Sequence, residues 1–189
     1  MAKVLLREIF RPIYPSPAAL ISCVAPDGTP NLITLGECFN ISISQPVVVG
    51  IAIAPERYSY GLIQKAGEFA VNLPTADMVE VVDRVGCASG RKVGDKFAYV
   101  GLTPFPATKI KAPLIAECPI NLECKLIDLI KAGDHDLFRG EVVAQHVDEA
   151  YLDARGRIAI EKLNPLCYIL GEYWSIGRKI GFHGFSKKK

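Results

Sequence analysis

The chain has 189 residues, of which half are apolar and 22% are charged, and its formal net charge is +2. This length suits one domain that buries its core without metal or disulfide cross-links, so we expect a single domain over residues 1–189 with its core at about 14–177. Apart from the terminal run 187–189, no basic stretch is long enough to follow a nucleic-acid backbone, which disfavours nucleic acid as a partner.

The N-terminal segment 1–13 carries charges among its apolar positions, unlike a signal peptide. No later stretch reaches the ~18 uncharged apolar residues that span a bilayer. We therefore expect a cytoplasmic protein without a membrane partner. Six irregularly spaced cysteines with no C-x-x-C pair predict reduced, mostly structural thiols and no metal site. Cys124 is in phase with apolar neighbours and is expected in the core.

The first half of the chain predicts a hairpin, a third strand, a helix and a fourth strand. An apolar run at 18–25 ends in an Asp-Gly turn flanked by prolines, and the partner strand is expected from 31 to about 38. The run 47–53 is apolar on both faces and predicts a central or interface strand. Between them, 36–45 is rich in hydrogen-bonding groups. A helix is expected over 58–66, ending at Gly67, before a strand at 69–73.

The middle of the chain predicts a second amphipathic helix, which begins near Thr75 or Asp77 and continues to about 85. A loop follows, in which we expect Asp95 and Lys96 to form a surface ion pair.

The second half predicts a long two-stranded ribbon. Period-two alternation at 120–126 predicts a half-buried strand with Asn121, Glu123 and Lys125 on its solvent face. The segment 133–135 predicts a hairpin tip, and 137–147 the returning strand. A last apolar segment spans 166–176, and the terminal lysines 187–189 are expected to be disordered.

Strands outnumber helices in this pattern, and their connections are short. We therefore predict a mainly β fold: a closed antiparallel barrel of about six strands with two or three peripheral helices. The positive mean hydropathy hints at an oligomer. The pattern alone leaves the function open, although no nucleophile elbow, zinc-protease helix or Walker loop points to a hydrolase.

Several segments, taken in their order and spacing, carry a family resemblance. They are Tyr14-Pro15 with Pro17, the stretches 31–46 and 56–74, the loop 88–91 with 95–97 behind it, and 133–135 leading to 140–142. In these segments the chain resembles the FMN-binding split-barrel flavin reductases, in particular their flavoredoxin-like branch. The resemblance covers roughly 14–149, with a weaker match at 173–177. It implies that the barrel is an antiparallel Greek-key split barrel of the FMN-binding type.

The resemblance implies FMN as the cofactor and one strand end as the contact for its ring and ribityl chain. Backbone donors and acceptors there would match the pyrimidine edge of the isoalloxazine. The implied residues are Leu35, Gly36, Glu37, Cys38, Phe39 and Asn40. The alternative is an ordinary strand end with polar contacts to solvent.

The resemblance also implies a phosphate site at the start of the first helix and a loop beside the ring. Helix amides, a hydroxyl and a guanidinium suit a phosphate dianion, and a glycine lets the loop come close. The implied residues are Arg57, Tyr58, Ser59 and Tyr60 in the helix, and Ala88, Ser89, Gly90 and Arg91 in the loop. The alternatives are a plain helix cap at Ser59 with a solvated Arg57, and a common turn at 88–91.

Three further side chains have open roles. His135 corresponds to a histidine beside the reactive face of the flavin and is the candidate catalytic residue, although a histidine at a hairpin tip is otherwise simply exposed. Tyr173 and Trp174 would cover the flavin, dock against a second subunit or pack in the core. Trp174 is included among the candidate cofactor contacts.

The implied function is electron transfer through FMN in a homodimer. One hypothesis is a flavin reductase that oxidises NADH or NADPH; since no G-x-G-x-x-G motif follows a predicted strand, the nicotinamide would bind on the open flavin face. A second is a flavoredoxin-type protein that takes electrons from a redox protein and is no enzyme. A third is an FMN-binding protein without a redox role.

Overall fold

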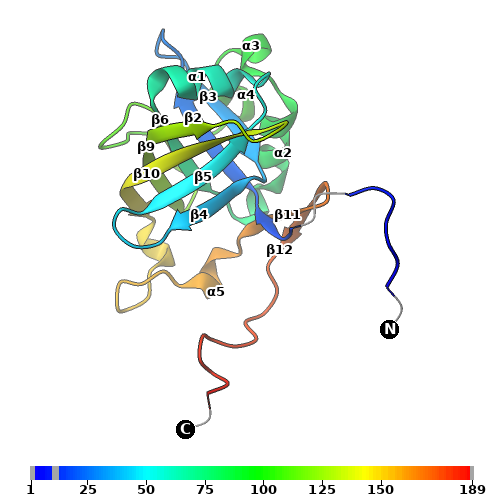
Figure 1. Ribbon diagram of the computed structural model, residues 1–189. Coiled ribbons are helices and arrows are strands. Elements are labelled where there is room, and N and C mark those ends of the chain that lie inside the picture. The colour runs from blue at the N-terminus through cyan, green and yellow to red at the C-terminus, as the bar shows by residue number, and fades with distance from the viewer. Residues whose placement is uncertain (1–2, 10–12, 188–189) are drawn as a thin grey trace.

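Seven antiparallel strands form the main sheet of the computed structural model, which describes residues 3–9 and 13–187. The strand order across the sheet is β3-β2-β6-β9-β10-β5-β4, and the sheet curls into a barrel (Figure 1). The strands are β2 (Ala19–Val24), β3 (Pro30–Leu35), β4 (Cys38–Ser42), β5 (Val48–Ile53), β6 (Glu68–Leu73), β9 (Ile120–Ile130) and β10 (Asp136–Val147). The predicted mainly β, antiparallel fold is confirmed.

Two small sheets and several helices surround this barrel. The small sheets pair β1 (Ser16–Pro17), β11 (Leu166–Ile169) and β12 (Glu172–Ser175) in one case, and β7 (Pro104–Phe105) with β8 (Leu114–Ile115) in the other. The α-helices are α1 (Tyr58–Ala66), α2 (Val79–Cys87), α3 (Gly90–Val93), α4 (Lys96–Val100) and α5 (Ile160–Leu163), and the 3-10 turns are η1 (Ala76–Met78) and η2 (Glu149–Tyr151).

Strand β2 lies between two apolar clusters, which explains why nearly all of its residues are apolar and buried. Ile21 and Cys23 point into the barrel core, where they join Phe69 and Phe138. Leu20 points to the other face, into the cluster that α2 and α4 cover. Since successive side chains of a strand alternate between faces, β2 buries both of its faces and fixes where α2 and α4 sit.

Helix α1 has the bounds that the sequence predicts. Gly67 ends it in the left-handed conformation, with φ of 70°, and its N–H donates to the carbonyl of Ile63 at 2.9 Å. Glycine adopts this conformation without the steric cost that a Cβ imposes. The cap therefore turns the chain directly into β6, which runs through the centre of the sheet.

The sheet differs from the predicted closed barrel at one place. The segment 36–45, for which the sequence predicted no strand of its own, contains β4, and the sheet has seven strands instead of about six. Edge strands β3 and β4 follow each other in the chain, joined by Gly36 and Glu37, and no ladder joins them among the described residues. The barrel is split between these two strands.

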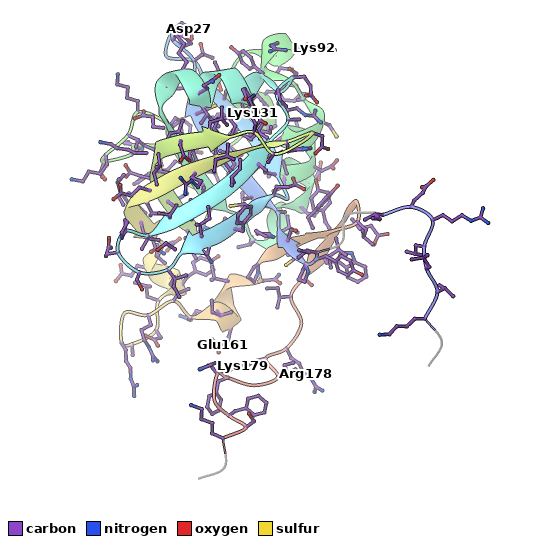
Figure 2. The ribbon with its side chains drawn as sticks, viewed as in Figure 1. Asp27, Lys92, Lys131, Glu161, Arg178 and Lys179 are labelled. Carbon is purple, nitrogen blue, oxygen red and sulfur yellow. The ribbon has the colours of Figure 1, made fainter. Side chains whose placement is uncertain are left out.

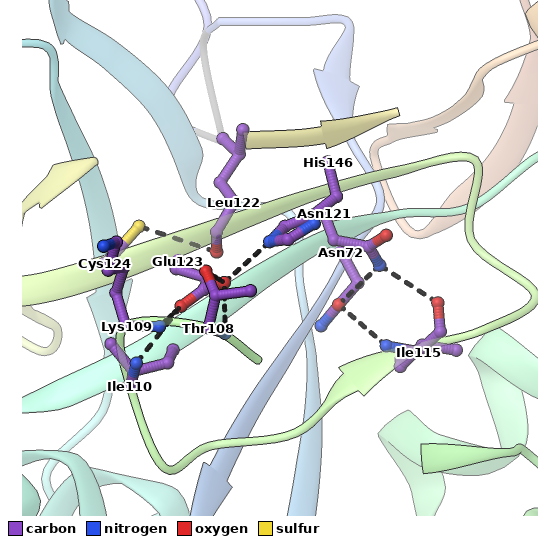
Figure 3. A network of polar contacts seen from close by, with 10 residues as sticks. All are labelled: Asn72, Thr108, Lys109, Ile110, Ile115, Asn121, Leu122, Glu123, Cys124 and His146. Atoms are coloured by element: carbon purple, nitrogen blue, oxygen red, sulfur yellow. Dashed lines mark hydrogen bonds and ion pairs between the residues drawn. The ribbon is translucent and has the colours of Figure 1, made fainter. Parts of the chain in front are cut away.

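The predicted solvent face of β9 is wrong for two of its three residues. Asn121 and Glu123 are buried, and only Lys125 is exposed. The segment 104–116, which contains β7 and β8, covers them, and Figure 3 shows how polar bonds hold it there. The Glu123 carboxylate accepts the N–H groups of Thr108, Lys109 and Ile110 and contacts Nε2 of His146 at 2.6 Å. A period-two pattern reports alternation, and it does not say what covers the polar face.

Both ends of the described chain extend from the barrel (Figure 1). They expose apolar side chains: Leu5 and Ile9 on the N-terminal segment, and Ile180 on the C-terminal one, are each more than nine-tenths exposed. Figure 2 shows Lys179 of the C-terminal segment beside Glu161 of α5, 4.0 Å apart. The predicted tail disorder concerns mainly Lys188 and Lys189, which lie outside the described residues, and the single domain over 1–189 stays a prediction.

The state of the cysteines and the length of the helices follow directly from the part of the chain that the structure describes. All six cysteines are free, and Cys124 is fully buried in the core. Among residues 3–9 and 13–187, no helix has the length and apolar character that crossing a membrane requires.

Candidate functional site

A cavity of about 420 Å³ opens where β3, the start of α1 and the turn between α2 and α3 meet. Its volume falls within the range of small-molecule sites. The predicted site residues that line it are Leu35, Gly36, Glu37, Arg57, Tyr58, Ser59, Ala88, Ser89, Gly90 and His135. The fold thus brings together residues from four segments that are far apart in the sequence.

Strand β3 contributes a whole edge to this cavity. It pairs with β2 on one side only, and every residue from Asn31 to Glu37 lines the cavity. An edge strand presents N–H and C=O groups that no neighbouring strand uses. One wall of the cavity therefore carries alternating backbone donors and acceptors.

Two helix starts meet at one end of the cavity. Arg57 precedes α1 in an extended conformation, and its side chain does not cap the helix. Ser59, in the first turn of α1, is 3% exposed. Ser89 precedes α3, likewise without a side-chain cap. Because the first N–H groups of a helix lack partners within it, this end of the cavity is rich in donors and suits an anion.

Lys96 corrects the prediction of a surface ion pair with Asp95. Its side chain is 2% exposed and lines the cavity, and its Nζ donates to the carbonyls of Val85 at 2.6 Å and Ala88 at 2.8 Å. The Asp95 carboxylate instead accepts the N–H groups of Phe97 and Ala98 and caps α4. Burial lowers the pKa of Lys96 to about 8, so at neutral pH an ammonium stands in the cavity wall.

The cavity also reaches the hairpin tip and the small sheet of β11 and β12. His135 lines it, and its Nδ1 lies 3.2 Å from Oδ1 of Asp134. Tyr168 and Tyr173 line it as well, with their rings edge to face at 5.5 Å between centroids. The Tyr173 hydroxyl donates to Asp83 at 3.2 Å, and burial, reinforced by this carboxylate, raises the pKa of Tyr173 to about 12. The phenol therefore keeps its proton.

Six predicted site residues lie outside the cavity lining. Cys38 is in the barrel core, and the exposed Phe39 and Asn40 are on β4. Tyr60 donates to the buried Asp136 at 2.6 Å behind the cavity.

The other two of these six residues are Arg91 and Trp174. The guanidinium of Arg91 lies over the ring of Tyr58, 5.5 Å from its centroid. Trp174 is 52% exposed, and its Nε1 donates to Glu172. Both lie near residues that line the cavity, and their contact with a ligand stays a prediction.

Sequence reasoning missed two buried polar residues of the lining, Asn31 and Lys96. Asn31 shares a strand face with Leu35, because side chains four apart on a strand point the same way, and this spacing was the available signal. Lys96 gave no such signal. Its burial depends on α2 and α4 packing together, which a local pattern does not report.

The chemistry of the cavity favours binding over covalent catalysis. Burial raises the pKa of the nearby Cys23 thiol to about 11, so it is no thiolate nucleophile at neutral pH. Among the described residues no group of three or more His, Cys, Asp or Glu side chains is arranged to hold a metal ion. What the cavity offers is a donor-rich end, an ammonium and a strand edge, which together suit a ligand with an anionic group and a flat polar ring.

Comparison with known proteins defines the class. Residues 10–177 match the model of the flavin reductase like domain, and the chain belongs to this family. The expected split-barrel flavin reductase resemblance is thereby confirmed.

Individual relatives agree with this assignment. The structure of flavoredoxin from Desulfovibrio vulgaris (Miyazaki F) is 30% identical with a TM-score of 0.90, and each chain covers the other completely. An FMN-binding protein from Thermus thermophilus, solved with bound 1-cyclohex-2-enone, is 28% identical with a TM-score of 0.76 over 93% of both chains. An uncharacterized protein of Archaeoglobus fulgidus is 36% identical over 126 residues, which are 67% of this chain and 70% of that protein.

Proposed function

We propose that the chain binds FMN in this cavity and passes electrons through it. The observation that carries the proposal is the convergence of the β3 edge, the Ser59 helix start and the Ser89-Gly90 turn on one cavity. The similarity to flavoredoxin and to an FMN-binding protein supports the same ligand.

The phosphate would lie at the end where α1 and α3 begin. The Ser59 hydroxyl and the first-turn amides donate to it, and the Lys96 ammonium supplies positive charge from the cavity wall. Arg57 adds a second charge at the exposed rim. A doubly negative group is thus met by donors and charges that are already in place, which lowers the entropic cost of binding.

The isoalloxazine would lie along β3, where free backbone groups match its polar edge. FMN, when bound, supplies the hydride and electron transfer chemistry. The protein holds one edge of the ring and leaves room for a donor. His135, which lines the cavity, would donate a proton or a hydrogen bond to the reduced ring or to a nicotinamide.

The identity of the electron donor decides whether the chain is an enzyme that oxidises a nicotinamide or a carrier that is reduced by another protein. We favour an NAD(P)H-dependent reductase, because His135 lines the cavity and an imidazole can donate to a nicotinamide. Anaerobic mixing of the FMN-loaded protein with NADH or NADPH tests this by loss of the yellow absorbance. Rapid bleaching that slows in His135→Ala, with unchanged FMN affinity, supports the reductase.

Two other results of the same experiment favour the alternatives. If neither nicotinamide bleaches the flavin but a reduced redox protein does, the chain is a flavoredoxin-type carrier. If nothing reduces it at a useful rate, it is an FMN-binding protein without a redox role.

The same proposal includes a homodimer. Edge strand β4 exposes Phe39 and Ile41, which are 48% and 42% exposed, and Ile43 just after it is 84% exposed. Both terminal segments expose further apolar side chains. Contiguous apolar surface of this kind marks an interface. Light scattering after gel filtration should give twice the chain mass, and Ile41→Lys with Ile43→Lys should shift it to the mass of one chain. A wild-type monomer would contradict the dimer.

The six free cysteines fit a reducing compartment, and we therefore place the protein in the cytoplasm. Fractionation of cells that express the full chain tests this placement.

A further inference from the structure

The side chain of Asn31 joins the segments that build the anion end of the cavity. It stands on β3, lines the cavity and is 2% exposed. Its Nδ2 donates to the Ser59 hydroxyl oxygen on α1 at 2.7 Å and to the Cys23 sulfur on β2 at 3.5 Å. Of the three elements, β3 and α1 both contribute to the cavity wall, and Asn31 fixes one relative to the other.

The oxygen of the same amide has no partner. Asn31 Oδ1 is the single buried side-chain nitrogen or oxygen without a hydrogen bond in the part of the chain that the structure describes. It faces the turn before α3, because a Cβ built on Gly90 would lie only 2.2 Å from it. Leaving a buried carbonyl oxygen unpaired is unfavourable, so the contribution of this amide lies in the bonds that its Nδ2 donates.

The bond to Ser59 decides what that hydroxyl can do. Since the Ser59 oxygen accepts from Asn31, the hydroxyl proton is left to be donated elsewhere. Two recipients are near: the cavity and the sulfur of Cys23. Burial keeps Cys23 in its thiol form, and a thiol is a weak acceptor. A phosphate oxygen in the cavity would be a much stronger acceptor.

We propose that Asn31 is a positioning residue for the phosphate: it orients the Ser59 hydroxyl as a donor into the cavity. The inference rests on the proposed binding of FMN. The chain of bonds runs from the Asn31 amide through the Ser59 hydroxyl to the phosphate, and each bond polarises the next. Asn31 itself acts through Ser59 and needs no contact with the flavin ring.

The experiment compares two flavins that differ only in the phosphate. Dissociation constants for FMN and riboflavin are measured by fluorescence quenching in the wild type, Asn31→Ala, Ser59→Ala and the double variant. Loss of one hydrogen bond to a charged group corresponds to about a tenfold or greater loss of affinity. Asn31→Ala should weaken the binding of FMN by about that factor and should change the dissociation constant of riboflavin by no more than about twofold.

The double variant separates positioning from a direct contact. If Asn31 acts through Ser59, Asn31→Ala has no further effect on FMN once Ser59 is alanine. The phosphorus NMR signal of bound FMN should also shift in Asn31→Ala. Independent, additive losses in the cycle would overturn the proposal, as would equal weakening of FMN and riboflavin.

A variant of the same size guards against a folding defect. Asn31→Asp keeps the shape but accepts the Ser59 proton, so the preference for FMN over riboflavin should fall more than in Asn31→Ala. An unchanged preference in folded Asn31→Asp would refute the positioning role even if Asn31→Ala does not fold. A wild-type protein that binds neither flavin would instead refute the proposed function.

Discussion

The buried ammonium of Lys96 donates to the carbonyl oxygen of Ala88 at 2.8 Å. This bond ties α4 to the turn that leads into Ser89 and Gly90. A second bond, to the carbonyl of Val85, holds the end of α2 at the same point. The shape of the turn thus depends on one side chain that comes after it in the sequence.

We expect Lys96→Met to lower the free energy of unfolding by about 2 to 4 kcal/mol, because two buried carbonyls lose their donor. FMN affinity should fall as well, since the charge and the turn geometry are both lost. Urea unfolding and flavin titration measure the two effects. Lys92→Met, at an exposed lysine of α3, is the matched control (Figure 2) and should change neither. Unchanged stability in Lys96→Met would contradict the account.

The charge of Lys96 predicts a pH dependence of ligand preference. Its pKa is lowered to about 8 by burial, so the ammonium is present below that pH and is lost as the pH rises through it. A bound dianion stabilises the charged form. The ratio of FMN affinity to riboflavin affinity should therefore fall between about pH 7 and pH 9. FMN and riboflavin share the isoalloxazine ring, so any effect of its titration cancels in the ratio of their affinities. The ratio should be flat over this range in Lys96→Met, and an equal slope in that variant would exclude Lys96 as its source.

Gly90 leaves no room for a side chain. A Cβ there would lie 2.2 Å from Asn31 Oδ1 and 2.9 Å from Cδ1 of Tyr58. We expect Gly90→Ala to push the turn away from the cavity and to lower the affinity for FMN by at least about tenfold. Gly61→Ala is the control, because its Cβ meets nothing within 4 Å and alanine favours the helix. Full FMN affinity in Gly90→Ala would show that the turn does not contact the ligand.

Glu123 predicts an effect on acid stability that is separate from the cavity. Burial opposes its ionisation, but bonds from Thr108, His146 and Lys109 outweigh it and lower the pKa of Glu123 to about 2. Because its pKa is lower in the folded than in the unfolded chain, the ionised carboxylate stabilises the fold at pH values above the unfolded pKa. This stabilisation is lost as the pH falls. Glu123→Gln should lower the free energy of unfolding by about 3 kcal/mol at pH 7. The free energy of unfolding of this variant should also decline less steeply toward pH 3 than that of the wild type.

Urea unfolding at several pH values measures the effect of Glu123→Gln. FMN affinity at neutral pH should be unchanged, because Glu123 does not line the cavity. A variant as stable as the wild type at pH 7, with the same acid transition, would show that the bonds to segment 104–116 contribute nothing.

The elements that local chemistry determines could be predicted from the sequence. The helix 58–66 with its Gly67 cap and the Asp27-Gly28 hairpin turn are set by residues adjacent in the chain. Strand β4 was missed although Phe39, Ile41 and Ile43 alternate with polar residues, because the segment 36–45 is also rich in hydrogen-bonding groups. The burial of Glu123 and Lys96 was missed for another reason: each is covered by a segment whose position depends on tertiary packing.

The predicted site residues fall into two groups, those that line the cavity and those that do not. Ser59, Ser89 and Gly90 were assigned through the family resemblance, and the fold brings them to one cavity. Trp174 and Phe39 were assigned in the same way, and they stand on exposed surface outside its lining. A second copy of the chain is what would bring such residues to a ligand, and sequence alone does not place it.

The measurement that tests the account most directly is titration of the purified chain with FMN, followed by absorbance near ~450 nm and by fluorescence, properties that belong to the flavin. The account predicts one FMN bound per chain, tighter binding of FMN than of riboflavin, and loss of that preference in Ser59→Ala. A colourless, folded protein that leaves the fluorescence of added FMN unchanged at about 0.1 mM would contradict it.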